Sequence, residues 1–237
     1  MSTRPSTRLS TRLSTRLIIR TLSEICVTVG TLIILLVVYV LYWTSVRADR
    51  AMDGEIDHLQ DRWATGTVTA GAQPSARPRR YEPGASFAIM YIPRFGTDWA
   101  KPVLEGTATG TLKKGLGHYS RTARLGDLGN FAVAGHRRTY GDPFKDFPEL
   151  RPGDAVVLTD GTTWFTYRID RRPYRTLPTD TEVIDPVPRA SGFRRSGRYL
   201  TLTTCEPEWG HSHRLIAWAH LDATQSVTQG KPKALYS

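Results

Sequence analysis

Cysteine is scarce in this chain, which contains Cys26 and Cys205 in 237 residues. A domain stabilised by several disulfides is therefore excluded. Cys26 lies within an apolar run and Cys205 in the last third of the chain, so a disulfide between the two is implausible. Cys205 is then an unpaired thiol, and such a residue is either a small buried hydrophobic side chain or a nucleophile.

Charged side chains are absent from residues 25–46. As a helix this segment would rise ~33 Å, enough to cross a hydrocarbon core of ~30 Å. Tyr39, Tyr42 and Trp43 lie toward one end, where aromatic side chains meet the membrane interface. A cleaved signal peptide is the alternative, but its apolar core usually has only about 7–15 residues. We therefore expect a retained, single-pass transmembrane anchor.

Acidic residues are the minority, with 22 Asp and Glu against 32 Lys and Arg and a formal charge of +10. Half of this excess lies in residues 1–47, which carry six Arg and one Glu. Arginines before the anchor predict a cytoplasmic N-terminus and an extracellular C-terminal part. The rest of the excess is spread thinly, which is typical of an ordinary basic surface, so no nucleic-acid partner is expected.

Composition divides the chain into four segments. Residues 1–24 form a basic, low-complexity arm with STRL repeats, which we expect to be cytoplasmic and disordered. The anchor spans 25–46, and residues 47–84 are expected to be an extracytoplasmic helix followed by a flexible Gly/Pro-rich linker. Residues 85–237 form the folded domain. The helix is predicted from four apolar residues spaced four, three and four apart: Met52, Ile56, Leu59 and Trp63.

Long helical patterns are lacking from residues 85–237, which are instead typical of a mainly β protein. Short β-branched or aromatic runs alternate with Gly/Pro turns. The predicted strands are 87–92, 130–134, 154–159, 163–170, 198–204 and 214–221. This pattern predicts an antiparallel barrel or sandwich.

Cys205 ends one predicted strand, and Arg214 opens the next, nine residues later. Alternation within 199–205 directs Leu200 and Leu202 to the core, so Cys205 should emerge on the less apolar face. If the two strands pair as a hairpin, Cys205 and Arg214 lie at the same end. Taken singly, a buried thiol and a solvated arginine remain the ordinary interpretations.

Three histidines lie near these strand ends. His136 follows the apolar strand 130–134, and a loop residue held by a rigid strand is a common position for catalytic groups. His211 and His213 lie between Cys205 and Arg214. A zinc site there would need a further ligand at suitable spacing, which is missing, so neither a metal nor another cofactor is expected.

Together these residues resemble the sortase family. The shared features are TLTTC ending at Cys205, GHR containing His136, and Arg214 at the start of the following strand. GHYSRTARLGDLGNFAVAGHR and TYGDPF (139–144) are similar to class E housekeeping sortases of high-GC Gram-positive bacteria. The resemblance covers about residues 85–222.

The resemblance implies an eight-stranded sortase β-barrel with short helices, preceded by the single transmembrane helix. It also implies a cysteine transpeptidase. Cys205 would attack the Thr–Gly bond of an LAxTG- or LPxTG-like sorting signal and form a thioacyl intermediate. His136 would be the general acid and base, and Arg214 would stabilise the oxyanion and orient the substrate. The resemblance further implies substrate-binding roles for His118, Tyr140, Thr203 and Thr204.

The implied partners are secreted proteins with C-terminal sorting signals and an amine of a peptidoglycan precursor. The enzyme would sit in the cell membrane with residues 85–237 outside. A pilus-assembling sortase is an alternative, in which Glu82-Pro83-Gly84 would belong to a lid. A catalytically silent scaffold of the same fold is another, whereas the SHGC motif of L,D-transpeptidases is absent.

Catalysis by this pair needs a thiolate on Cys205 and a proton on His136. With ordinary pKa values of about 8.5 and 6.5, pH 7 gives ~3% thiolate and ~24% imidazolium. If the two groups titrated independently, less than ~1% of the molecules would carry both the thiolate and the imidazolium. We therefore expect slow turnover or coupled titration of the two groups.

Overall fold

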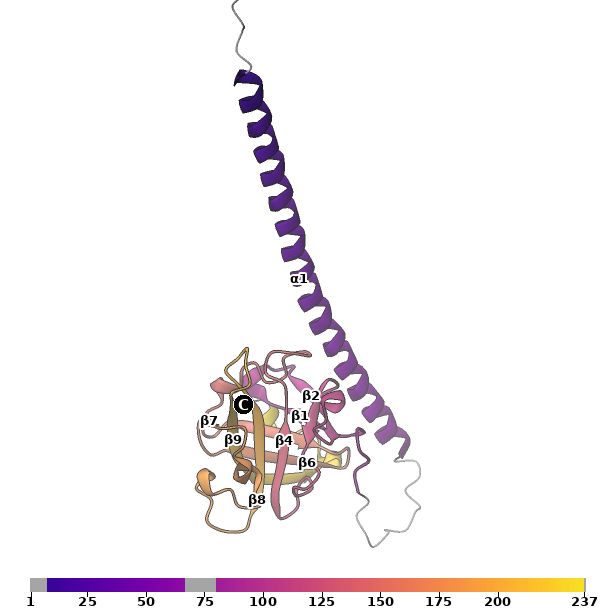
Figure 1. Ribbon diagram of the computed structural model, residues 1–237. Coiled ribbons are helices and arrows are strands. Elements are labelled where there is room, and N and C mark those ends of the chain that lie inside the picture. Colours follow the sequence, from indigo (N-terminus) through magenta and orange to yellow (C-terminus); the bar gives the residue numbers. More distant parts are fainter. Residues whose placement is uncertain (1–7, 67–79, 237) are drawn as a thin grey trace, which may run out of the picture. The chain divides into compact units, whose positions relative to one another are not determined.

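The computed structural model describes residues 8–66 and 80–236 (Figure 1). The chain divides into two units, Met1–Thr44 and Ser45–Ser237, which are described separately below. Residues 67–79, the greater part of the predicted linker, lie outside the described residues, as do residues 1–7 of the predicted arm.

The first unit contains the N-terminal part of helix α1 (Arg8–Gly66). Leu17–Tyr39 is long and apolar enough to cross a membrane, with a mean hydropathy of 2.3 and none of it buried. It overlaps the predicted anchor but begins eight residues earlier. This earlier part contains an ion pair of 3.0 Å between Arg20 and Glu24. The expectation of disorder is wrong for residues 8–17, which are helical. Leu and Arg both favour helix, which explains how the helix extends into the repeats.

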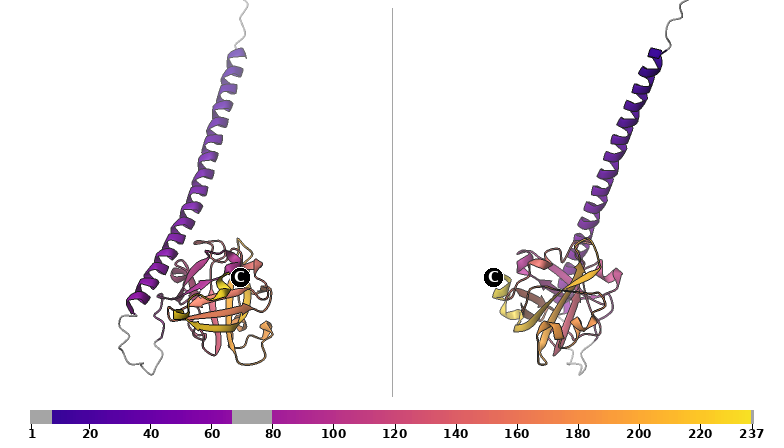
Figure 2. Two further views of the ribbon diagram at one scale, coloured as in Figure 1. Left: turned by 180° about the vertical axis from the view of Figure 1, so that it is seen from behind. Right: turned by 60° about the vertical axis from the view of Figure 1, so that its left-hand side comes forward.

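The described part of the second unit contains nine strands. They are β1 (Ser86–Tyr91), β2 (Ala100–Glu105), β3 (Leu116–His118), β4 (Gly129–Ala134), β5 (Ala155–Thr159), β6 (Thr163–Ile169), β7 (Tyr174–Thr176), β8 (Arg198–Glu206) and β9 (His213–Ser226). The strand order is β6-β5-β1-β2-β3-β4-β8-β9-β7, and β6 also pairs with β9. Eight strands therefore close a barrel, and β7 pairs with β9 outside this ring. Figure 2 shows the barrel from two further sides. The eight-stranded barrel is confirmed, and a sandwich is excluded.

Short helices connect the strands. They are α2 (Thr109–Leu112) and the 3-10 helices η2 (Pro93–Phe95), η3 (Phe147–Glu149), η4 (Thr181–Ile184), η5 (Arg189–Ser191), η6 (Val227–Gln229) and η7 (Lys233–Tyr236). Of these, η4 and η5 lie between β7 and β8, and η6 and η7 follow β9. Both segments lack the alternation of a strand.

Two neighbouring pairs in the ring are parallel, so the prediction of a wholly antiparallel barrel is wrong. β2 pairs in parallel with β3, and β4 in parallel with β8. Parallel neighbours need a crossover connection, and β4 and β8 are joined through β5, β6 and β7. Because β4 and β8 run in the same direction, the loops after both strands emerge at one end of the barrel.

The barrel core follows the predicted alternation. Leu200 and Leu202 of β8 are fully buried and pack in the core with Leu215, Ala217 and Ala219 of β9. Each buried leucine contributes about 1.5–3 kcal/mol relative to exposure. The opposite face of β9 is buried too, since Ile216 and Trp218 pack against Val183 of η4. The strands near the predicted site are thus held from both sides.

Residues 45–66 of α1 belong to the second unit. They are helical, as the spacing of apolar residues predicted. Met52 and Leu59 are fully buried, whereas Ile56 and Trp63 are half-buried.

Candidate active site

Cys205 and Arg214 are brought together by the β8–β9 hairpin. The two residues are direct partners in the antiparallel register. This pairing confirms that both lie at the same end of the hairpin. The Cys205 side chain is half-buried, and Nη1 of Arg214 donates hydrogen bonds of 3.0 Å to the carbonyl oxygens of His211 and His213. The turn between the strands therefore holds the guanidinium in place.

His136 reaches the same end through the parallel pairing of β4 with β8. Ala134 is opposite Thr203 in the register, and His136 and Cys205 each follow two residues later. Thr204 Oγ1 donates a 2.8 Å hydrogen bond to the carbonyl oxygen of Gly135, the residue before His136. His136 and Cys205 consequently line one pocket of about 200 Å³.

Two loops form the walls of this pocket. One wall is the segment 136–139 after β4, and the other includes Cys205 and residues 208–211. Arg214 is not among the pocket residues and lies beside it, on the strand that follows. A cleft between two loops, with a thiol and an imidazole on it, is suited to acyl transfer through a covalent intermediate.

Arginines 137 and 138 connect the two walls, and sequence reasoning missed them. Nη1 of Arg137 donates to the Glu206 carboxylate and lies 3.5 Å from the Cys205 carbonyl oxygen. Nε of Arg138 is 2.7 Å from Glu208 Oε1 in an ion pair. Its guanidinium also lies over the Trp209 ring, 4.8 Å from the centroid. The signal available in the sequence was the charge complementarity of His-Arg-Arg and Glu-Pro-Glu-Trp.

The surroundings of His136 disfavour its protonated form. Burial lowers the pKa of His136, and the positive charge of Lys113 lowers it further. Within the described residues, Nε2 of His136 is buried and has no hydrogen-bond partner. The ring packs beside Tyr140 at 5.1 Å between centroids, and Lys113 Nζ lies 5.0 Å from the centre of the Tyr140 ring. The neighbourhood therefore disfavours the imidazolium.

Burial also lowers the pKa of Arg137, although the charges of Glu208 and Cys205 act in the opposite direction. The arginine remains a cation, because its ordinary pKa is far above neutrality. A fixed positive charge thus interacts favourably with a thiolate at Cys205.

Of the four residues predicted to bind substrate, only Tyr140 lies beside His136. Thr203 is 4% exposed, and its Oγ1 is 3.0 Å from the Tyr119 hydroxyl. Thr204 is 3% exposed and bonded to Gly135, as described above. Neither threonine is among the residues that line the Cys205 pocket. In this conformation neither hydroxyl is free, because they bond to the residues that directly follow β3 and β4.

His118 lies in the interior, away from the Cys205 pocket. It is 2% exposed, and its Nδ1 is 2.6 Å from Glu105 Oε2. The ring stacks on Phe131 at 4.7 Å, and Nε2 is 3.1 Å from the Ala123 carbonyl oxygen. Alternation places His118 on the same face as the core residue Leu116, which explains its burial.

The remaining histidines do not form a metal centre with Cys205. His211 lines the pocket, whereas Nδ1 of His213 is 3.1 Å from Nη2 of Arg175. Among residues 8–66 and 80–236, no group of three His, Cys, Asp or Glu side chains is arranged to hold a metal ion.

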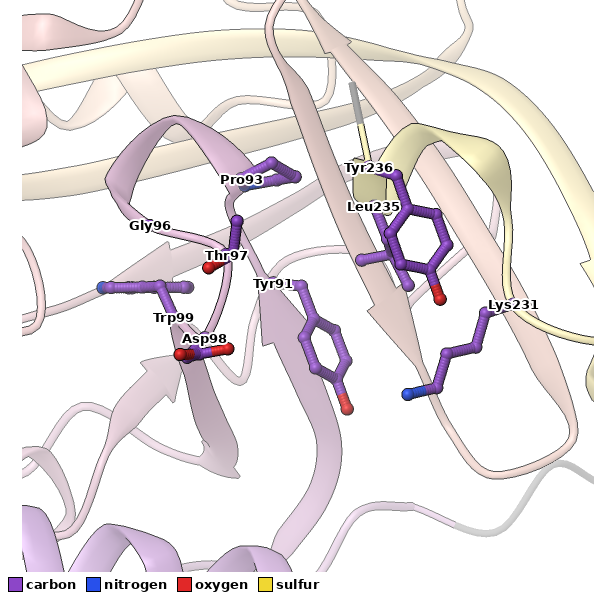
Figure 3. A pocket seen from close by; sticks show the side chains of 9 residues that line it. All are labelled: Tyr91, Pro93, Gly96, Thr97, Asp98, Trp99, Lys231, Leu235 and Tyr236. Carbon is purple, nitrogen blue, oxygen red and sulfur yellow. The ribbon is translucent and has the colours of Figure 1, made fainter.

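Two other pockets contain no cysteine. One of about 450 Å³ lies between the η2 loop and η7. Figure 3 shows the rings of Tyr91 and Tyr236 and the Lys231 amine around it. Another, of about 890 Å³, is lined by residues 80–83 and by the region of His118. Neither contains a thiol, although Thr122 Oγ1 in the second pocket is 3.1 Å from His118 Nε2.

Comparison with known proteins gives consistent matches. The sortase domain family matches residues 90–222. The chain is 39% identical over 225 residues to sortase SrtE1 of Streptomyces coelicolor, covering 92% of this chain and 61% of the relative. It therefore spans less than two thirds of that relative's length. It is 31% identical over 212 residues to sortase SrtE2 of the same organism, covering 87% of this chain and 83% of the relative.

Solved structures match about two thirds of this chain. Sortase E from Streptomyces avermitilis is 74% identical with a TM-score of 0.62, covering 65% of this chain and 99% of that one. Sortase E1 from Streptomyces coelicolor, solved with a tripeptide in the active site, is 37% identical with a TM-score of 0.61, at the same coverage.

Proposed function

This chain belongs to the sortase family, most like the class E sortases, and we propose that it is a transpeptidase whose nucleophile is Cys205. The observation that carries the proposal is that Cys205 and His136 line one pocket, although 68 residues separate them in sequence. Arg214 faces Cys205 across the β8–β9 ladder. These are the three residues required for covalent acyl transfer with a proton donor and an oxyanion partner.

The first half of the reaction forms a thioester. Sγ of Cys205 attacks the threonine carbonyl carbon of a Thr–Gly bond, and the C–N bond breaks. His136 donates its proton to the departing glycine amine. In the second half, His136 removes a proton from an incoming amine, which attacks the thioester and releases Cys205. One peptide bond is broken and one amide bond is formed, so no oxidant or cofactor is needed.

Arg214 is proposed to stabilise the oxyanion and orient the peptide. Its Nη1 donates to two carbonyl oxygens, of His211 in the turn and of His213 at the start of β9. These two bonds fix the planar guanidinium. Its remaining N–H groups point in other directions. A preorganised donor of this kind contributes most where charge develops in the transition state.

The substrate class is a protein with a C-terminal LAxTG- or LPxTG-like sorting signal, and the acceptor is a peptidoglycan amine. A peptide substrate is supported by the relative from Streptomyces coelicolor that holds a tripeptide in its active site. The apolar stretch Leu17–Tyr39 supports a single-pass anchor in the cell membrane. The arginines before it favour a cytoplasmic N-terminus, with the barrel outside the cell.

The pilus-assembling alternative would need a lid over the pocket. Glu82 and Pro83 instead line the pocket near His118, and Pro83 forms a β-bridge with Glu105. The described residues 80–84 thus give no support to a lid over Cys205, and attachment to the cell wall is the function we propose.

The test uses the full chain in detergent micelles with LAxTG and LPxTG peptides. We expect cleavage between Thr and Gly, transfer to an added amine, and a mass increase on Cys205 that matches the acyl fragment. Cys205→Ala should abolish cleavage while thermal unfolding stays unchanged. Cleavage by Cys205→Ala, or an acyl group on another residue, would contradict the mechanism.

A further inference from the structure

The part of α1 that belongs to the second unit has one buried face. Met52 and Leu59 are 0% exposed, and Ala48 is 7% exposed. Spacings of four and seven place these residues on one side of a helix. By contrast, Asp53, Asp57 and His58 are exposed. A helix buried on one side only is packed against the barrel of the same unit.

Polar contacts identify the strands that this helix covers. Lys101 Nζ of β2 is 3.2 Å from Asp49 Oδ1. On β1, Ser86 donates from Oγ to the Glu55 carboxylate at 3.0 Å and accepts at its carbonyl oxygen from Arg62 Nη2 at 2.6 Å. The helix therefore lies along the outer face of β1 and β2.

Burial on β1 supports this placement. Ala88 and Met90 are in the barrel core, so alternation turns Ile89 outward. Ile89 is nonetheless 0% exposed. An outward apolar residue without exposure must be covered, and the polar contacts of the helix with Ser86 and Lys101 place it on this side of β1 and β2.

At one end the helix reaches the loop that follows His136. A Cβ placed on Gly141 would lie 2.6 Å from Asp49 Oδ1 and 3.1 Å from Met52 Cε. Asp49 and Met52 are therefore in close contact with the backbone of Gly141. The preceding residue, Tyr140, packs beside His136 with ring centroids 5.1 Å apart.

This loop has an unfavourable backbone conformation. Tyr140, Gly141 and Asp142 all have positive φ, of 54°, 78° and 46°. Only glycine adopts this region freely, so the backbone is strained at Tyr140 and Asp142. Such conformations persist where surrounding structure holds them. Asp49 and Met52 are the helix side chains that touch the middle of the loop.

We propose that the membrane-proximal part of α1 positions His136 through the 140–142 loop, with Asp49 and Met52 as positioning residues. The proposal rests on the function proposed above for His136. It makes the helix next to the anchor a part of the active-site support, although neither positioning residue touches the substrate. Releasing the helix would let Tyr140 move from His136, which would become more exposed and more readily protonated.

Docking of the helix is tested first, without reference to activity. Zero-length carbodiimide coupling of the full chain in detergent should join Asp49 to Lys101, detectable as a cross-linked peptide by mass spectrometry. Met52→Glu should abolish the cross-link, because it places a charge in the buried face. Asp53→Asn, on the exposed face, should leave it unchanged. Absence of the cross-link in the wild type would overturn the proposal.

Positioning is tested by kinetics on the same variants. We expect Met52→Glu to lower kcat about tenfold with KM unchanged, as a misplaced acid/base does. The limb of the pH profile that reports His136 should move to higher pH. Met52→Leu, which keeps an apolar side chain, should have nearly the kcat and pH profile of the wild type. Asp53→Asn should behave as wild type. If Met52→Glu lowered Tm but left kcat and the pH profile unchanged, the helix would only stabilise the fold. That result would overturn the proposal.

Inactive wild-type protein would contradict the proposed function rather than this inference. Hydrogen exchange of residues 139–142 then decides the inference. Faster exchange there in Met52→Glu than in Asp53→Asn would support it, and equal exchange would refute it.

Discussion

Nη1 of Arg137 lies 3.5 Å from the carbonyl oxygen of Cys205, so the residue after the proposed base contacts the backbone of the proposed nucleophile. The same nitrogen pairs with the carboxylate of Glu206. Arg137 is 8% exposed, which is unusual for an arginine and indicates a structural pairing. The ends of β4 and β8 are thus connected by a side chain as well as by their ladder.

We predict that Arg137→Ala lowers kcat/KM by about tenfold or more, because the loops bearing His136 and Cys205 lose a shared charge-assisted contact. Arg137→Lys should recover only part of the activity, since the ammonium keeps the charge but lacks the planar guanidinium that places Nη1 at both acceptors. Arg94→Ala removes an exposed arginine that pairs with Asp154 at 2.6 Å, and it is the matched control. The measurement is kcat/KM with the sorting peptide. If Arg137→Ala and Arg94→Ala lowered kcat/KM equally, Arg137 would have no specific role in the site.

The pH dependence should respond to Lys113. Its charge lowers the pKa of His136, so Lys113→Gln should raise that pKa and increase the imidazolium fraction at a given pH. If protonated His136 is the acid, activity persists to higher pH in the variant. Burial is the larger cause and remains, so the shift is partial. The pH profile of kcat/KM measures it. Lys114→Gln serves as the control, and a shift to lower pH would contradict the assignment.

Gly135→Ala should disturb the position of His136 through a clash with side chains of the barrel core. A Cβ at this position would lie 2.6 Å from Phe144 Cδ2 and 2.8 Å from Leu116 Cδ2. Both neighbours are fully buried and have little room to move. We expect a loss of about 1–3 kcal/mol in unfolding free energy, and a lower kcat because His136 is the next residue. Gly110→Ala meets no atom within 4 Å and should lower neither quantity.

His118→Asn tests whether His118 binds substrate or supports the barrel. Removing the imidazole leaves the Glu105 carboxylate, 7% exposed, without its 2.6 Å partner. A buried carboxyl group that loses its hydrogen-bond partner costs about 1–3 kcal/mol, so Tm should fall by several degrees while KM for the peptide stays unchanged. His220→Asn, which removes an exposed pairing with Asp170, should change Tm little. A raised KM with an unchanged Tm would instead place His118 in the substrate groove.

Alternation and spacing predicted that Cys205 and Arg214 lie at the same end if their strands form a hairpin, and the structure adds that the two residues are direct partners. Both residues belong to strands with a regular two-residue period, and a short turn restricts their register. The inward leucines of β8 followed from the same pattern. The sequence also predicted the helix that contains Met52 and Leu59, because its apolar residues recur with helical spacing.

The parallel pairing of β4 with β8 could not be derived in this way. When two strands are far apart in sequence, no local sequence pattern indicates that they pair. His136 approaches Cys205 only through the pairing of β4 with β8. The roles of Arg137 and Arg138 depend on the same long-range contact. β2, β3 and β7 escaped prediction because they are short or contain Pro and Gly, which weaken a strand pattern.

The length of β9 has a consequence for how the protein behaves among copies of itself. This strand pairs with β8 from His213 to His220 and with β6 from Ala219 to Ser226, which closes the ring. Among the described strands, β7 is then the one left with an open edge, and its three residues include the charged Arg175. Unpaired edges are where β proteins recruit further strands and aggregate. A barrel concentrated on a two-dimensional membrane surface would thereby resist sheet-to-sheet association with its neighbours.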